Sequence, residues 1–149
     1  MGKENDLRRA RLMHTLFSGF FNLQNRLLNA EAKISDDISI KQWLLLAEVE
    51  DGDSPRSLTE LGRLLGCSRQ NVKKLAAELE KKGYVRIARG DGNSVVVEAT
   101  EKVEDYKDSV KERQVESLEV LFSDFSDEEV EQFYELCRKL DAGIRRLEG

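Results

Sequence analysis

A run of polar side chains after Ser68 has the residue types and spacing needed to bind nucleic acid. The run comprises Arg69, Gln70, Asn71, Lys73 and Lys74. In the major groove of duplex DNA, Gln and Asn amides pair with adenine edges, and Arg and Lys bind guanine or phosphate. The Ser68 hydroxyl and the N–H groups of a following helical turn suit a backbone phosphate. These residues are therefore candidate DNA-binding residues.

An amphipathic helix over residues 69–82 would place this run on one side. The residues at helical spacing that would face a core are Val72, Leu75, Ala76 and Leu79. Ser68 is a favourable N-cap, and Gly83 follows Lys81 and Lys82 at the expected C-terminal position. An ordinary solvated helix face would explain the same pattern, so this helix alone does not decide the function.

A short helix is expected immediately before it, over residues 58–65. Ser57 or Thr59 can cap this helix, and Ser57 with Glu60 fits a capping box. Gly66-Cys67 then predicts a tight break between the two helices.

A β-hairpin is expected immediately after it. Strands over residues 84–89 and 94–99 flank Gly90-Asp91-Gly92-Asn93, which is rich in turn-forming residues. Helix, glycine turn, helix and hairpin in this order predict a winged helix-turn-helix. The full order favours DNA binding over the solvated-face interpretation.

Longer helices are expected on both sides of this region. One runs from Leu7 to Ala32 with a wide apolar stripe, and a shorter one from Ser39 to Val49 is apolar nearly all round and is expected to be buried. Another opens at Thr100 and ends near Phe122, and the last begins at the capping box Ser126-Asp127-Glu128-Glu129. The last helix carries an apolar seam of Val130, Phe133, Cys137, Leu140, Ile144 and Leu147. Such a seam usually docks on another helix, often on a second chain.

Composition narrows the class of protein. The chain has 149 residues, of which 40% are apolar and 36% charged, and a single proline favours long helices. No apolar run approaches the ~20 residues of a membrane span, and the charged first residues lack the core of a signal peptide. One histidine and two distant cysteines suggest neither a metal site nor a disulfide framework. We expect a cytoplasmic protein that is not an enzyme and has no membrane partner.

The charge is unevenly distributed along the chain. The net charge of −5 argues against a polyanion partner, but residues 61–100 carry eight basic and four acidic side chains. Residues 101–135 carry four basic and thirteen acidic ones. A basic segment beside a strongly acidic one indicates a polyanion-facing element on an acidic body.

The region between residues 58 and 85 resembles the MarR family of bacterial and archaeal transcriptional regulators. The matching segments are Leu58-Thr59-Glu60-Leu61-Gly62, Leu65-Gly66-Cys67-Ser68-Arg69-Gln70-Asn71-Val72-Lys73-Lys74-Leu75 and Leu79-Glu80-Lys81-Lys82-Gly83-Tyr84-Val85. Trp43 on the preceding helix, the strand ending at Thr100 and the two C-terminal helices also fit, so the resemblance covers nearly the whole chain.

The resemblance implies a mainly α fold with a small β-wing, in a single domain over residues 1–149. Residues 1–34 and 100–149 would form dimerisation helices, and residues 39–99 the winged helix. It implies a homodimeric regulator, usually a repressor, that places helix 69–82 in the major groove of a pseudo-palindromic operator with half-site centres about 34 Å apart. A winged-helix scaffold that binds proteins instead of DNA is the alternative, which the net charge and the short wing permit.

The wing departs from the family pattern, in which an arginine near the tip enters the minor groove. Asp91 can stand at the family's acidic position, but Asn93 and Ser94 stand where arginine is expected. Arg86 and Arg89 remain on the first strand of the hairpin over residues 86–97. We expect phosphate binding by Arg89, a weak reading of A·T pairs by Asn93, and greater reliance on helix 69–82.

Regulation is suggested by a few residues only. Cys67 precedes a helix N-terminus and lies beside Arg69, and both features favour a reactive thiol that would serve as a redox sensor. The simpler interpretation is that Cys67 is a small residue that fills the turn between the two helices. Family members often release DNA on binding a small phenolic effector. His14, Trp43 and the aromatic residues Phe17, Phe20 and Phe21 could line an effector cavity, although such residues more often belong to a core. No cofactor is expected.

Overall fold

The computed structural model describes residues 2–30 and 37–149. The chain forms two compact units, Met1–Asp108 and Ser109–Gly149. The first unit contains helices α1 (Gly2–Ala30), α2 (Ile40–Glu50), α3 (Leu58–Leu65) and α4 (Arg69–Lys81), strands β1 (Arg56–Ser57), β2 (Val85–Arg89) and β3 (Val95–Ala99), and the start of α5 (Lys102–Leu121). The rest of α5 and helix α6 (Asp127–Glu148) form the second unit.

Each predicted helix start in the central region is fixed by a serine. Ser39, Ser57 and Ser68 have extended backbones, and each side chain accepts a hydrogen bond from an N–H group of the first helical turn. At Ser39 and Ser57 the third helical residue, Gln42 or Glu60, returns the bond as a capping box. The predicted helix starts at α2, α3 and α4 are therefore confirmed.

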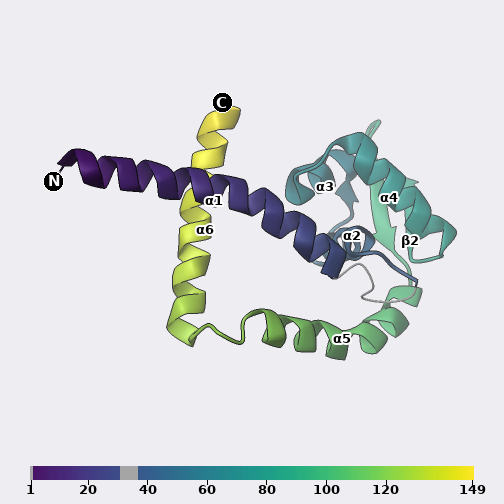
Figure 1. Cartoon of the computed structure of the whole chain (residues 1–149). Helices are drawn as coiled ribbons and strands as arrows, with labels where there is room; N and C mark the ends of the chain where they lie inside the picture. Colours follow the sequence, from purple (N-terminus) through teal and green to yellow (C-terminus); the bar gives the residue numbers. More distant parts are fainter. Residues whose placement is uncertain (1, 31–36) are drawn as a thin grey trace. The chain divides into compact units, whose positions relative to one another are not determined.

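The three strands form one antiparallel sheet in the order β1-β3-β2. β2 and β3 are the predicted hairpin, with Arg86 opposite Glu98 and Ile87 opposite Val97. The two-residue strand β1 was not predicted, and it pairs with β3 at Val96 and Val97. Figure 1 shows the hairpin beside α2, α3 and α4. The observed order of elements confirms the winged helix-turn-helix.

The core of the first unit lies among α2, α3, α4 and the sheet. Its almost completely buried side chains are Ile38, Leu45, Leu46, Leu58, Leu61, Val72, Leu79, Val97 and Val103. The expectation that α2 is buried nearly all round was only partly right, because Leu44 is 39% exposed. The start of α5 joins this core through Val103 and Tyr106, and the Tyr106 ring meets Tyr84 edge-on at 5.5 Å.

Helix α1 is longer at its start than predicted, because it begins at Gly2 and not at Leu7. Its predicted end at Ala32 lies outside the described residues. The apolar stripe is exposed in the single chain, and it comprises Leu7, Leu12, Met13, Leu16, Phe17, Phe20, Phe21, Leu23 and Leu27. The aromatic residues of α1 therefore do not belong to a core within this chain.

The second unit is organised by the turn between α5 and α6. Ser126 caps α6 with Glu129 in the predicted capping box. Phe125 meets Phe122 edge-on at 5.5 Å and Phe133 at 6.1 Å, which pins the turn against the start of α6. The seam of α6 is exposed at Val130, Phe133, Leu140, Ile144 and Leu147, whereas Cys137 is half-buried.

Candidate nucleic-acid interface

The N-terminus of α4 has the geometry of a phosphate-binding helix end. The Ser68 hydroxyl accepts a hydrogen bond of 3.2 Å from the Asn71 N–H group. An α-helix leaves the N–H groups of its first turn without acceptors inside the helix, so those of Arg69 and Gln70 point outward from its N-terminus. The helix dipole adds partial positive charge at this end.

One side of α4 is apolar and buried, and the other is polar and exposed. Val72, Ala76 and Leu79 are completely buried, and Leu75 is half-buried. The exposed side chains are Arg69, Gln70, Asn71, Lys73 and Lys74, here called the polar face of α4. The structure therefore brings the helical candidate residues together on one surface, with Ser68 exposed at its start.

The turn before α4 is held by close backbone packing. A Cβ atom on Gly62 would lie 2.8 Å from the Cys67 carbonyl oxygen, so a larger residue would separate α3 from the turn. Gly66 has a φ of 65° and ends α3 in the left-handed conformation, as expected of a C-terminal glycine. These two glycines fix the angle at which α3 presents α4. Cys67 is a half-buried free cysteine in the same turn.

The wing tip is compact. A Cβ atom on Gly90 would lie 2.6 Å from the Ser94 Oγ atom and 2.7 Å from Val96, so the tip closes tightly there. The Ser94 hydroxyl donates a 2.8 Å hydrogen bond to the Asp91 carbonyl and is engaged within the turn. Arg89 and Asn93 are exposed. Of the candidate residues at the tip, these two therefore keep side chains that are accessible from outside the protein.

Arg86 is exposed but is already engaged in an ion pair. It lies opposite Glu98, and its Nε–H group donates a 3.1 Å hydrogen bond to the Glu98 carboxylate, with a second contact from Nη2. This hydrogen bond, together with the charge of Glu98, raises the pKa of Arg86 above its ordinary value. A phosphate would have to compete with Glu98 for this guanidinium group. The role of Glu98 as a competitor was not predicted from the sequence.

Polar contacts behind α4 hold its C-terminal half. The buried Gln42 side chain donates a 2.9 Å hydrogen bond to Glu78 and accepts one of 3.1 Å from the Lys82 ammonium group. The Tyr84 hydroxyl donates a 2.6 Å bond to the Asp37 carboxylate. Burial, followed by this hydrogen bond, raises the pKa of Tyr84 to about 12. These contacts tie the C-terminal half of α4 to α2, and the residue before the first wing strand to the segment before α2.

Glu80, near the end of α4, contacts the wing directly. Its carboxylate accepts a 2.6 Å hydrogen bond from the backbone N–H group of Ile87 in β2. Sequence reasoning missed this contact because it depends on how the chain turns between helix and strand. The only sequence signal is a carboxylate five residues before a strand, which is too common to be informative.

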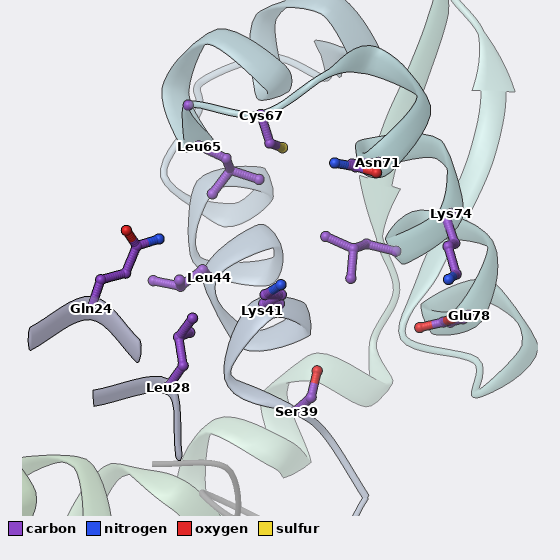
Figure 2. Close-up of a pocket in the computed structure, with 12 residues that line it drawn as sticks. Gln24, Leu28, Ser39, Lys41, Leu44, Leu65, Cys67, Asn71, Lys74 and Glu78 are labelled. Atoms are coloured by element: carbon purple, nitrogen blue, oxygen red, sulfur yellow. The ribbon is translucent and has the colours of Figure 1, made fainter. Parts of the chain in front are cut away.

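A pocket of about 500 Å³ lies in the first unit beside the polar face of α4 (Figure 2). Its lining comprises Gln24, Leu28, Ser39, Lys41, Leu44, Leu65, Gly66, Cys67, Asn71, Lys74, Leu75 and Glu78. Asn71 and Lys74 therefore belong both to the pocket wall and to the polar face of α4. The residues suggested for an effector cavity, His14, Trp43 and the α1 aromatic residues, are absent from this lining.

Across residues 2–30 and 37–149, no three His, Cys, Asp or Glu side chains gather as a metal ion would require. Within the same ranges, no helix is both long and apolar enough to cross a bilayer.

Comparisons with known proteins agree with this architecture. A sequence model of the MarR family matches residues 36–93. The transcriptional repressor MprA of Escherichia coli (strain K12) is 29% identical over an alignment of 133 residues that covers 85% of this chain and 75% of MprA.

Solved structures share the fold. A MarR/EmrR family transcriptional regulator from Acinetobacter sp. ADP1 has a TM-score of 0.81 at 18% identity, covering 91% of this chain and 98% of its own. The Staphylococcus aureus MepR–DNA complex has a TM-score of 0.74 at 17% identity, covering 84% of this chain and 94% of MepR. The chain thus has the winged-helix fold of MarR-family structures, and over residues 36–93 its sequence matches this family of transcriptional regulators.

Proposed function

We propose that this regulator is a homodimeric, sequence-specific repressor that places α4 in the major groove of DNA. The observation that carries the proposal is the polar face of α4, which lies opposite a largely buried apolar side and begins at a capped helix N-terminus. Gln70 and Asn71 would read base edges, and the cations around them would bind phosphate or guanine. A relative named as a repressor and a structural neighbour solved with DNA support it.

The homodimer is supported by apolar surface that a single chain leaves exposed. Helix α1 exposes its apolar stripe, and α6 exposes most of its seam. A monomeric soluble protein rarely leaves contiguous apolar surface of this kind in water, so a second copy is the proposed partner of both helices. A two-fold dimer would present two copies of α4 to half-sites about 34 Å apart.

The wing has a smaller role in the proposal. Arg89 would bind a backbone phosphate and Asn93 would approach the minor groove, where it can distinguish A·T from G·C pairs only weakly. Arg86 would contribute after exchanging its Glu98 partner for phosphate.

The pocket beside α4 is the proposed effector site. A small phenolic carboxylate could place its anionic group near Lys41 and Lys74 and its ring near Leu44. Because Asn71 and Lys74 also belong to the DNA-facing surface, an occupant that moves them would weaken operator binding. Salicylate is a suitable probe: Leu44→Trp, which fills the pocket, should abolish salicylate binding, so that salicylate no longer changes the affinity of this variant for DNA. Release of DNA by salicylate that is unchanged in this variant would contradict the assignment.

Selection of bound sequences from a random duplex pool tests the central proposal. We expect an enriched pseudo-palindrome, with an affinity that falls steeply between two salt concentrations because phosphate contacts release counterions. Absence of enrichment, both with and without reductant, would favour the protein-binding scaffold. Enrichment only with reductant would show that oxidised Cys67 or Cys137 blocks DNA binding, and Cys67→Ser would identify which one.

A further inference from the structure

We propose that Glu80 is a positioning residue of the DNA interface, which ties the wing to α4 so that both meet DNA as one rigid unit. The proposal rests on the DNA-binding function proposed above. The contact that carries it is the 2.6 Å hydrogen bond from the Ile87 N–H group to the Glu80 carboxylate.

The register of the hairpin shows that this N–H group points to the outer edge of the sheet. Thr100 N–H donates to the Tyr84 carbonyl, and Gly90 N–H donates to the Ser94 carbonyl. Hydrogen-bonded pairs in an antiparallel ladder alternate with pairs that are not hydrogen-bonded. Ile87, three residues from each of these positions, therefore directs its N–H group away from β3. Since β2 is an edge strand, Glu80 supplies an acceptor that the sheet itself does not provide.

A second attachment lies at the junction of α4 and β2. Gly83 has a φ of 84°, its N–H group donates to the Glu80 carbonyl, and Tyr84 N–H donates to the Leu79 carbonyl. This pair of bonds is a Schellman motif, which fixes how the chain leaves the helix. It reaches only as far as Tyr84, the residue before the strand. Glu80 adds an anchor three residues further along, so β2 is held at two points and cannot swing about Gly83.

The charge of Glu80 makes the proposal testable. The Glu80 carboxylate is exposed, and a carboxylate near DNA repels phosphate. If Glu80 had no positioning role, the protein would therefore bind DNA more tightly after this carboxylate is removed. Glu80→Gln keeps an acceptor oxygen and removes the charge, and it should bind the selected operator at least as tightly as the wild type. Glu80→Ala removes both, and its operator affinity should fall about fivefold, which is the effect of losing one hydrogen bond.

Two further readouts separate positioning from a general loss of stability. Amide exchange at Ile87, measured without DNA, should accelerate in Glu80→Ala but not in Glu80→Gln, while exchange at the buried Val72 and Val97 stays unchanged in both. The affinity lost on Arg89→Ala should be smaller in the Glu80→Ala background than in the wild type, because the wing is then already displaced.

The outcomes distinguish this proposal from the proposed function. If the wild type binds DNA but Glu80→Ala binds as tightly as Glu80→Gln, or Arg89→Ala costs the same in both backgrounds, the positioning role is wrong and the function stands. If the wild type binds no DNA, the positioning role and the proposed function are both wrong, whatever the rate of amide exchange at Ile87.

Discussion

Arg86 and Glu98 face each other across the two strands of the wing, and their side chains are joined by two contacts from the guanidinium group to one carboxylate oxygen. A cation on the wing of a DNA-binding protein would ordinarily be counted as a phosphate contact. Here the cross-strand partner already neutralises it, so its contribution to DNA binding depends on whether phosphate can displace Glu98.

Glu98→Gln should release Arg86 for phosphate binding. We expect tighter binding of all duplex sequences, and a salt slope that steepens by about 0.9 because one more phosphate is neutralised. Affinity measured across a salt series, on selected and scrambled duplexes, checks both effects.

Removal of a negative charge from the wing would also strengthen binding in a general way, and a second background separates the two causes. In Arg86→Ala, the Glu98→Gln change has no cation to release, so the slope should stay constant. A slope that steepens equally in both backgrounds would show that Arg86 does not bind phosphate.

The predicted parts of the fold are those set by neighbouring residues. The Ser57–Glu60 and Ser126–Glu129 capping boxes each join residues three apart, and the sequence alone is enough to recognise them. Strand β1 was missed because Arg56 and Ser57 carry no strand pattern, and pair with Val96 and Val97 only once the chain has folded. A two-residue strand made by a distant partner has no local signal.

The same distinction between local and long-range features applies to the candidate site. The exposed polar face of α4 follows from helical periodicity, which places Gln70 opposite the buried Leu79. The Arg86–Glu98 pair depends on strand register, and the Glu80–Ile87 bond depends on the angle between a helix and a strand. Neither quantity can be derived from residue types. DNA contact by the candidate residues stays a prediction, as does the division into dimerisation helices and winged helix.

Gln70→Ala should reduce sequence discrimination. Gln70 is exposed in the first turn of α4, where an amide can form two hydrogen bonds with an adenine edge. Loss of that contact should cost about 1–3 kcal/mol on the selected operator and little on scrambled DNA. Competition binding between the two duplexes measures the difference. If their affinity ratio does not change, Gln70 does not read a base.

Tyr84→Phe should change the dependence of stability on pH at high pH. The pKa of Tyr84 is raised to about 12 from an ordinary value of 10.0, so the folded state holds the hydroxyl proton more tightly than the unfolded state. The resulting stabilisation is complete below pH 10 and is lost as pH rises to about 12, a loss of order 2–3 kcal/mol.

Urea unfolding at several values from pH 9 to pH 12 tests this sign. The wild type should lose more stability over this range than Tyr84→Phe, which has no hydroxyl to ionise at this position. At pH 9 the variant should already be about 1 kcal/mol less stable, because Asp37 loses its hydrogen-bond donor. If the free energy of unfolding falls by the same amount with pH in both proteins, the raised pKa of Tyr84 is contradicted.

Ile144→Glu should weaken the homodimer. Ile144 belongs to the α6 seam and is 46% exposed in the single chain, so a partner helix would cover an apolar side chain there. Sedimentation over a range of concentrations should show a shift toward monomer and, with it, weaker operator binding. Lys139→Glu changes the charge by −2, compared with −1 for Ile144→Glu, on the same helix away from the seam, and is the control. Equal dimerisation of both variants and the wild type would place the interface elsewhere.

Lys74→Ala tests the double role of a residue that belongs both to the polar face of α4 and to the pocket. Lys74 is exposed on α4 and also lines the pocket. If its ammonium group binds phosphate, affinity should fall by a similar factor for operator and scrambled DNA, and the salt slope should decrease by about 0.9. A loss confined to the operator would show instead that Lys74 reads a base.

Salicylate should also bind the Lys74→Ala variant less tightly, because the carboxylate of salicylate loses one of its two proposed cations. Unchanged salicylate binding together with weaker DNA binding would separate the two surfaces and leave Lys74 to DNA alone.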